Sequence, residues 1–143
     1  MGNWTAIAES VLSGKEFTRG EALAVLGSPD VDLLDLLGAA YKVRHHYHGN
    51  KVKLHVLENA MSGMCPEDCK FCSQSNIATG EIERYRLESK AEMVAAAKKA
   101  KAAGAYKYCI VTSTRGPSDP QLATICAAVK EIKDTVGIRV CTS

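Results

Sequence analysis

The sequence predicts an α/β fold, in which an N-terminal helical segment (residues 1–50) precedes the first strands and helices of a (β/α) barrel of the TIM type (residues 51–143). Helical patterns with capping residues fill the first segment. From residue 51 the order becomes strand, long loop, helix, strand, helix, strand, and this alternation implies right-handed crossovers and a parallel sheet. A complete barrel takes about 250 residues. We therefore expect these 143 residues to be the front part of a longer barrel, truncated at the C-terminus.

Two helices are expected at the start of the first segment. The stretch around residues 7–12 is amphipathic and is expected to end at Gly14. Thr18 and Glu21 have the spacing of a capping box, in which each side chain accepts a hydrogen bond at the start of a helix. That helix should continue through Leu26.

A third helix is expected from Ser28-Pro29 to about His46, because proline is favoured in a first helical turn. Gly49-Asn50 then breaks the pattern. The expected apolar stripe of this helix consists of Leu33, Leu34, Leu37 and Tyr41.

The second segment begins with an alternating stretch, "KVKLHVLENA", over residues 51–60. Such alternation predicts a strand. Its expected apolar face consists of Val52, Leu54 and Val56.

After a loop rich in small and polar residues, Ser89 and Glu92 form a second capping box. It should begin a helix rich in alanine and lysine that ends at Gly104. The run "YKYCIVTS" (residues 106–113) is typical of a buried parallel strand.

The last helix should begin at the Ser118–Gln121 cap, and the run "IRVCTS" (residues 138–143) should form a third strand. The helix carries an apolar stripe at helical spacing. Its members are Leu122, Ile125, Val129, Ile132 and Val136.

Composition excludes several classes of function. The chain is 46% hydrophobic and 24% charged, with a net charge of +2 and no basic block, so we expect no nucleic-acid partner. No apolar stretch approaches the ~18–20 residues that a membrane span requires, and the first residues do not have the form of a secretion signal. We therefore expect a cytoplasmic protein whose six cysteines remain thiols.

Three of these cysteines, Cys65, Cys69 and Cys72, lie within the stretch "MCPEDCKFCSQ". Iron–sulfur clusters are held by cysteine thiolates, and three thiolates on a four-iron cluster leave one iron open. The loop follows a strand and hence lies at the carboxyl end of the sheet, where α/β proteins place their chemistry.

A structural zinc site is the alternative, and it needs a fourth ligand. Disulfide bonding of the three cysteines is disfavoured by their odd number and by a reducing compartment. The candidates for a fourth zinc ligand are His45, His46, His48 and His55.

The Cys-x-x-x-Cys-x-x-Cys spacing, with Phe71 before the last cysteine, resembles the signature of the radical S-adenosylmethionine enzymes. The resemblance implies that Cys65, Cys69 and Cys72 bind a [4Fe–4S] cluster and carry radical generation, with Phe71 at the cofactor. S-adenosylmethionine would chelate the fourth iron through its amine and carboxylate. One electron would then cleave the sulfonium to methionine and a 5′-deoxyadenosyl radical.

Cys109 and Cys141 lie in the second and third expected strands. Because side chains alternate along a strand, neighbouring parallel strands would bring the two thiols close together on one face. Two interpretations remain open from the residues alone. The thiols are either ligands inside the barrel or small buried hydrophobic groups.

Four stretches, "RGEALAVL", "NAMSGMCPEDCKFCSQS", "YCIVTSTRGPS" and "AAVKEIKDTVGIRVC", are similar to the biotin synthase family over essentially the whole chain. The resemblance implies a sulfurtransferase (EC 2.8.1.6) that inserts sulfur into dethiobiotin in the last step of biotin biosynthesis. It also implies a sulfur-donating [2Fe–2S] cluster, held in part by Cys109 and Cys141. The family's remaining cysteine and arginine ligands, and most asparagines that contact dethiobiotin, lie beyond Ser143. Met61 stands where the family commonly has lysine.

The same resemblance implies an electron donor such as flavodoxin or ferredoxin, and a homodimer for the full-length protein. We expect the 143 residues alone to be inactive and prone to aggregation. A lipoyl-type sulfur-inserting enzyme is a second hypothesis, but that family has additional cysteines upstream of the signature and none precedes Cys65 here. A zinc-binding interaction module is a third.

The remaining candidates have simpler interpretations. Cys126 is expected to be a packed core thiol on the last helix. The three histidines at the end of the third helix should complement its last carbonyls. Tyr85 and Arg86 either contact the nucleoside or carboxylate of the cofactor or lie on the surface.

Overall fold

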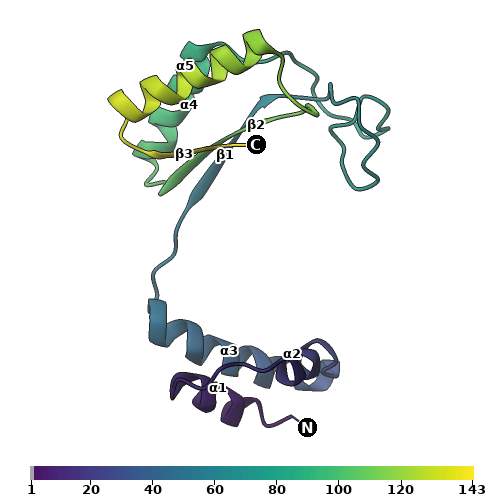
Figure 1. The fold of residues 1–143 in the computed structure, drawn as a ribbon, viewed down its shortest axis with the longest axis vertical. Helices are drawn as coiled ribbons and strands as arrows, with labels where there is room; N and C mark the ends of the chain where they lie inside the picture. The colour runs from purple at the N-terminus through teal and green to yellow at the C-terminus, as the bar shows by residue number, and fades with distance from the viewer. Residues whose placement is uncertain (1) are drawn as a thin grey trace. The chain divides into compact units, whose positions relative to one another are not determined.

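The structure, a computed structural model, describes residues 2–143 and divides into two compact units, Met1–Val52 and Lys53–Ser143 (Figure 1). Each unit has its own hydrophobic core. Among the described residues, the helices are too short or too polar to cross a lipid bilayer.

The first unit is helical, as predicted. Its second helix begins with the expected capping box, because Thr18 Oγ1 accepts from the Glu21 backbone N–H and Glu21 accepts from the Thr18 N–H. The elements are helix α1 (Trp4–Leu12), helix α2 (Arg19–Leu26), the short 3₁₀ helix η1 (Asp30–Asp32) and helix α3 (Leu33–His48).

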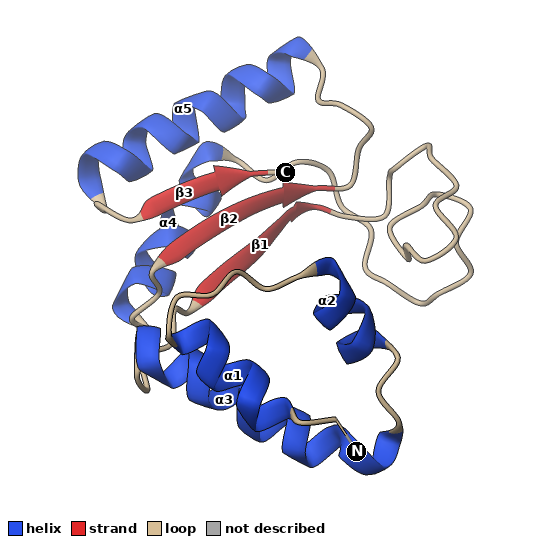
Figure 2. Ribbon diagram, turned by 60° about the horizontal axis from the view of Figure 1, so that its bottom comes forward, coloured by secondary structure: helices blue, strands red, loops and turns tan. Residues whose placement is uncertain are grey.

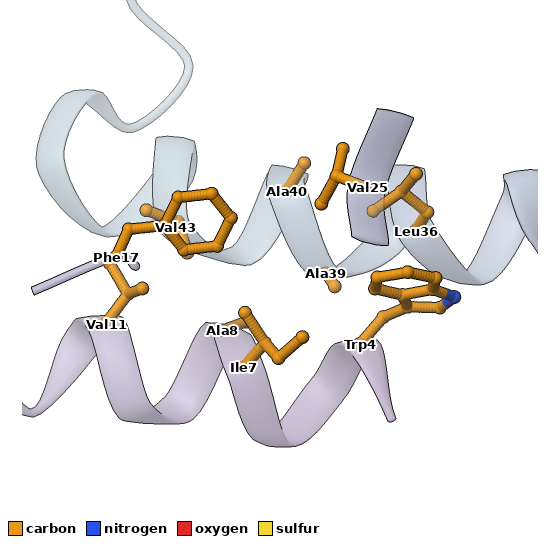
Figure 3. A pocket seen from close by; sticks show the side chains of 10 residues that line it. All are labelled: Trp4, Ile7, Ala8, Val11, Phe17, Val25, Leu36, Ala39, Ala40 and Val43. Atoms are coloured by element: carbon orange, nitrogen blue, oxygen red, sulfur yellow. The ribbon is translucent and has the colours of Figure 1, made fainter. Parts of the chain in front are cut away.

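The core of this unit forms where α1 packs on α3 through Trp4, Ala8 and Ala39. Asp32 is buried beside them, and its carboxylate accepts hydrogen bonds from Trp4 Nε1 (3.3 Å) and the Gly2 N–H (2.9 Å). A wholly apolar pocket of about 340 Å³ opens between the helices (Figure 3).

The apolar stripe predicted for α3 is wrong. All four of its expected members are about half-exposed or more: Leu33, Leu34, Leu37 and Tyr41. The face that packs is formed instead by Leu36, Ala39 and Val43, which follow the same helical spacing on a different side of the helix.

The second unit is a three-stranded parallel sheet in the order β1-β2-β3, with both helices on one face (Figures 1 and 2). The predicted strand and helix order and the parallel sheet are confirmed. The elements are strand β1 (His55–Met61), helix α4 (Lys90–Ala102), strand β2 (Lys107–Thr112), helix α5 (Asp119–Thr135) and strand β3 (Arg139–Thr142).

Strand β1 begins later than predicted. Its first residue in register is His55, which pairs with Lys107 at the start of β2. Val52 and Leu54 precede this pairing and are 83% and 48% exposed, so they form no buried strand face. The alternating pattern was correct only from Val56 onward, where the helices cover the sheet.

The two faces of the sheet differ in environment. Tyr108 and Ile110 are fully buried against Met93 of α4 and Ile132 of α5. The Tyr108 hydroxyl donates to the Met93 carbonyl at 3.1 Å, which ties β2 to α4. Within the second unit, both helices lie on that one face, and Leu57 on the opposite face is largely exposed.

Candidate functional site

The segment 62–89 joins β1 to α4 and lies beyond the carboxyl ends of the strands (Figure 2). We call this segment the cysteine loop. Parallel α/β folds place chemistry at this edge because several strand ends and their loops converge there. The position predicted for the loop is confirmed.

The structure places the three signature cysteines in this loop in different environments. Cys65 is half-buried, whereas Cys69 and Cys72 are exposed. The Cys72 N–H donates to the Cys69 carbonyl at 2.9 Å, which closes a tight turn between them. Phe71 is fully exposed between the two. Across residues 2–143, no three side chains of the histidine, cysteine or acidic type are arranged as a metal site.

The start of the loop is held by backbone pairing. Ser62 and Tyr85 exchange two hydrogen bonds, from Ser62 N–H to Tyr85 O (3.1 Å) and from Tyr85 N–H to Ser62 O (3.2 Å). The Tyr85 hydroxyl also donates to the Asn59 carbonyl. Tyr85 therefore packs against the end of β1, and Arg86 beside it is exposed.

Two further residues also hold the start of the cysteine loop, and they were not identified from the sequence. The Gln74 side-chain oxygen accepts from the Gly63 N–H (2.9 Å) and the Ser62 hydroxyl (3.1 Å). Buried Ser113, at the end of β2, accepts from the Met64 N–H at 3.2 Å. The stretch "CSQS" gives no local signal for these contacts, because Gln74 and Gly63 are eleven residues apart.

Glu88, near the end of the cysteine loop, is a perturbed carboxyl group. Its Oε2 is buried and has no hydrogen-bond partner among the described residues. Burial, followed by the nearby charges of Glu58 and Glu92, raises the pKa of Glu88 to about 7. This group lies on the side of the sheet that faces α4, because Glu58 and Glu92 line the same hollow.

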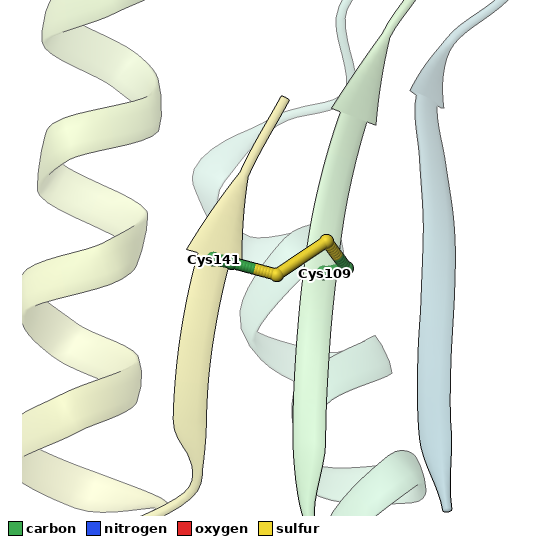
Figure 4. Close-up of a disulfide and its surroundings, with 2 residues drawn as sticks. All are labelled: Cys109 and Cys141. Carbon is green, nitrogen blue, oxygen red and sulfur yellow. A yellow bond between two sulfur atoms is a disulfide. The ribbon is translucent and has the colours of Figure 1, made fainter. Parts of the chain in front are cut away.

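Cys109 and Cys141 lie in directly paired positions of β2 and β3, with their Cα atoms 4.7 Å apart. The prediction that the two sulfurs lie close together on one face is confirmed. The prediction that all six cysteines are thiols is wrong for this structure, because Cys109 and Cys141 form a disulfide (Figure 4). The Cα separation falls within the range that a disulfide can bridge.

Cys126 differs from its predicted role. Its side chain is exposed, whereas Ile125 and Ala128 provide the buried face of α5. Ile132 completes that face and Leu122 does not. The predicted stripe is therefore correct for Ile125, Val129, Ile132 and Val136, which are buried or pack against the core, and wrong for Leu122. The prediction that Cys126 is a packed core thiol is also wrong.

The second unit provides no histidine near the three cysteines as the fourth ligand of the alternative zinc site. His55 stacks on Tyr106, with ring centroids 5.9 Å apart, at the amino end of β1. A strand of seven residues spans roughly 20 Å, so His55 lies at the opposite end of β1 from the cysteine loop. The other three histidines lie in the last turn of α3, as predicted.

The donor set of the loop fits an iron–sulfur cluster. Three cysteine sulfurs are available without a bonded partner, and soft thiolates are the ligands that such clusters use. The residues present therefore fit a [4Fe–4S] cluster that has one iron without a protein ligand.

Comparison with known proteins agrees with this chemistry. The profile of the Radical SAM superfamily matches residues 60–143. The chain is 48% identical to biotin synthase from Geobacillus kaustophilus (strain HTA426) over 141 residues, which cover 99% of this chain and 42% of that protein. It is 49% identical to biotin synthase from Anoxybacillus flavithermus (strain DSM 21510 / WK1) over 139 residues, or 97% of this chain and 42% of that one.

The fold has a solved counterpart in the crystal structure of methylornithine synthase. That structure matches with a TM-score of 0.76 and 28% identity, over 96% of this chain and 40% of the other. The sheet and its helices thus form part of a TIM-type barrel, as predicted. The chain spans about two fifths of the length of the curated relatives that it matches. Because the superfamily profile covers more than half of its residues, the chain belongs to the radical SAM superfamily.

Proposed function

We propose that this chain is the N-terminal portion of a biotin synthase, which converts dethiobiotin to biotin by radical-dependent sulfur insertion. The observation that carries the proposal is the 48% identity to a biotin synthase over 99% of the chain, together with the cysteine triad in the loop after β1. The overall reaction breaks two C–H bonds of dethiobiotin and forms two C–S bonds to one sulfur atom. Its classification is that of a sulfurtransferase, EC 2.8.1.6.

In this proposal Cys65, Cys69 and Cys72 would hold a [4Fe–4S] cluster, which when bound would supply one electron for reductive cleavage of S-adenosylmethionine. Cys65 would contribute its thiolate from a half-buried position, and the turn that joins Cys69 to Cys72 would contribute the other two. Phe71 would cover the cofactor from the same turn.

Cys109 and Cys141 are proposed to hold part of a [2Fe–2S] cluster. Their pairing across β2 and β3 supports this role, since directly paired positions place both sulfurs on the same face of the sheet. The disulfide between them must first be reduced. A dithiol reductant would supply the two electrons and two protons that break the S–S bond and would itself become a disulfide; the two thiols formed would lose their protons when they bind iron.

The proposed partners follow from the same assignment. The intact protein would bind dethiobiotin, accept electrons from a donor such as flavodoxin or ferredoxin, and form a homodimer. It would act in the cytoplasm, without a nucleic-acid partner. The residues that complete the [2Fe–2S] site and contact most of the substrate would follow Ser143.

The test uses full-length protein purified without oxygen and supplied with S-adenosylmethionine, a reductant and dethiobiotin. Biotin and 5′-deoxyadenosine should form. Separate Cys65→Ala, Cys69→Ala and Cys72→Ala variants should lose both products, whereas Cys126→Ala should retain them. Formation of 5′-deoxyadenosine without biotin would support another radical SAM enzyme instead, and the absence of both products would reject the proposal.

A further inference from the structure

Four consecutive backbone N–H groups at the start of the cysteine loop each have a partner. Ser62 donates to the Tyr85 carbonyl (3.1 Å) and Met64 to the Ser113 hydroxyl (3.2 Å). The other two, from Gly63 and Cys65, both donate to Gln74. One residue therefore satisfies two of the four donors that lead to the first cysteine.

Gln74 uses its side chain and its backbone for these contacts. Its side-chain oxygen accepts from the Gly63 N–H at 2.9 Å, and its backbone carbonyl accepts from the Cys65 N–H at 3.2 Å. The Cys65 carbonyl in turn accepts from the Asn76 N–H at 2.8 Å. Cys65 is therefore held on both sides by the segment that follows the third cysteine.

Burial strengthens this arrangement. Ser62 and Ser75 are each 2% exposed, and Gly63 is buried between them and the rest of the loop. Hydrogen bonds in such surroundings are costly to remove, because the groups left behind have no water to replace the lost partner. Cys69 and Cys72, by contrast, are exposed and lie outside this network.

We propose that Gln74 is a positioning residue for the cluster, because its side-chain oxygen locks the strand-to-loop junction and thereby fixes the sulfur of Cys65. This inference rests on the proposed function, since it assumes that Cys65 is a cluster ligand. Residues that orient a ligand in this way commonly change metal affinity by roughly 10–100-fold.

The variants separate the hydrogen bonds from the volume of the side chain. Gln74→Leu removes the acceptor and retains similar bulk, whereas Gln74→Glu retains an oxygen that can accept both hydrogen bonds. Ser62→Ala removes one of the two bonds. Ser73→Ala is the matched control, because Ser73 is exposed and adjacent in sequence.

Two measurements on the full-length protein test whether Gln74 positions Cys65. In the cluster-free protein, Gln74→Leu should speed amide hydrogen exchange at Gly63 by about 10-fold, the loss expected for the one hydrogen bond that this amide donates, whereas the Cys65 amide keeps its bond to the Gln74 backbone carbonyl. In the reconstituted protein, iron release to a chelator should be roughly 10-fold faster than in wild type. Gln74→Glu and Ser73→Ala should behave like wild type, and Ser62→Ala should fall between.

A folded Gln74→Leu protein that releases iron at the wild-type rate would overturn the proposal. If Gln74→Leu does not fold, a wild-type rate of iron release in Ser62→Ala would overturn it equally. A purely structural role of these hydrogen bonds would lower the thermal midpoint of Gln74→Leu without changing iron release. If wild type binds no four-iron cluster, the proposed function fails, and the exchange rates still report whether the Gln74 side chain holds the Gly63 backbone.

Discussion

At the residue scale, Glu88 should make stability depend on pH. Its pKa is raised to about 7 by burial and by the charges of Glu58 and Glu92. The folded state binds the proton of the Glu88 carboxyl group more tightly than the unfolded state does. Protonated Glu88 therefore stabilises the fold fully below pH 4.5, and this stabilisation is lost as pH rises through about 7. Glu88→Gln should therefore raise the free energy of unfolding at pH 8 by on the order of 1 kcal/mol and change it little at pH 4.5.

Thermal unfolding at the two pH values checks this prediction. Glu92→Gln is the contrasting variant, because hydrogen bonds from Ser89 hold the pKa of Glu92 below its usual value. That substitution should destabilise α4 at neutral pH by weakening its capping box. Equal changes in the stability of the two variants at pH 8 would contradict a raised pKa for Glu88.

Gly63 is the second residue with a specific expectation. Its φ of +68° favours glycine, and a Cβ there would lie 2.6 Å from Arg84 Cγ and 3.3 Å from Ile82 Cδ1. Gly63→Ala should lower the free energy of unfolding by about 2 kcal/mol, the sum of backbone strain and crowding. Gly104→Ala is the control, because Gly104 also has a positive φ (+82°) but has open space where its Cβ would be.

Urea unfolding of the two variants separates crowding from strain. Gly104→Ala should cost about 1 kcal/mol, the strain alone. Equal losses in both variants would mean that the loop side chains move aside and that Gly63 is needed only for its backbone conformation.

At the element scale, α5 is held on the sheet by a short buried stripe. Ile132 is fully buried, so Ile132→Ala should cost about 2–5 kcal/mol through lost burial and the cavity that remains. Ile77→Ala is the control, because Ile77 lies in the cysteine loop and is 63% exposed. It should lower the free energy of unfolding by less than about 1 kcal/mol. Chemical unfolding measures both, and comparable losses would show that α5 is not packed as described.

Local signals predicted the ends of elements better than their buried faces. The capping boxes at Thr18 and Ser89 were correct because their hydrogen bonds join residues three positions apart. The stripe of α3 was wrong because leucines occupy two sides of that helix, and only packing against α1 selects the side with Leu36. The start of β1 depended on where β2 begins, which the sequence of β1 does not contain.

In the candidate site, too, local features could be predicted from the sequence and contacts between distant residues could not. The cysteine spacing predicted the superfamily from eight consecutive positions, and the superfamily profile confirms that prediction. The hydrogen bonds of Gln74 and Ser113 could not be predicted, because their partners lie eleven and forty-nine residues away in the sequence. The adjacency of Cys109 and Cys141 was predictable because it follows from strand alternation and parallel pairing.

At the scale of the whole molecule, the 143-residue chain should form no biotin by itself. The residues that the structure describes contain three parallel strands, and the curated relatives are more than twice as long as the chain. Incubation of the reconstituted chain with dethiobiotin, S-adenosylmethionine and reductant should yield no product above background, whereas full-length protein should turn over. Measurable biotin from the 143 residues would contradict this expectation.

Mössbauer spectroscopy of iron-57-reconstituted full-length protein, with and without S-adenosylmethionine, tests most directly whether three cysteines hold a four-iron cluster with one open iron. We expect four irons in one cluster, of which three keep their spectra and one changes when S-adenosylmethionine binds. Four irons that do not respond to S-adenosylmethionine, or a colourless protein with stoichiometric zinc and no iron, would contradict it.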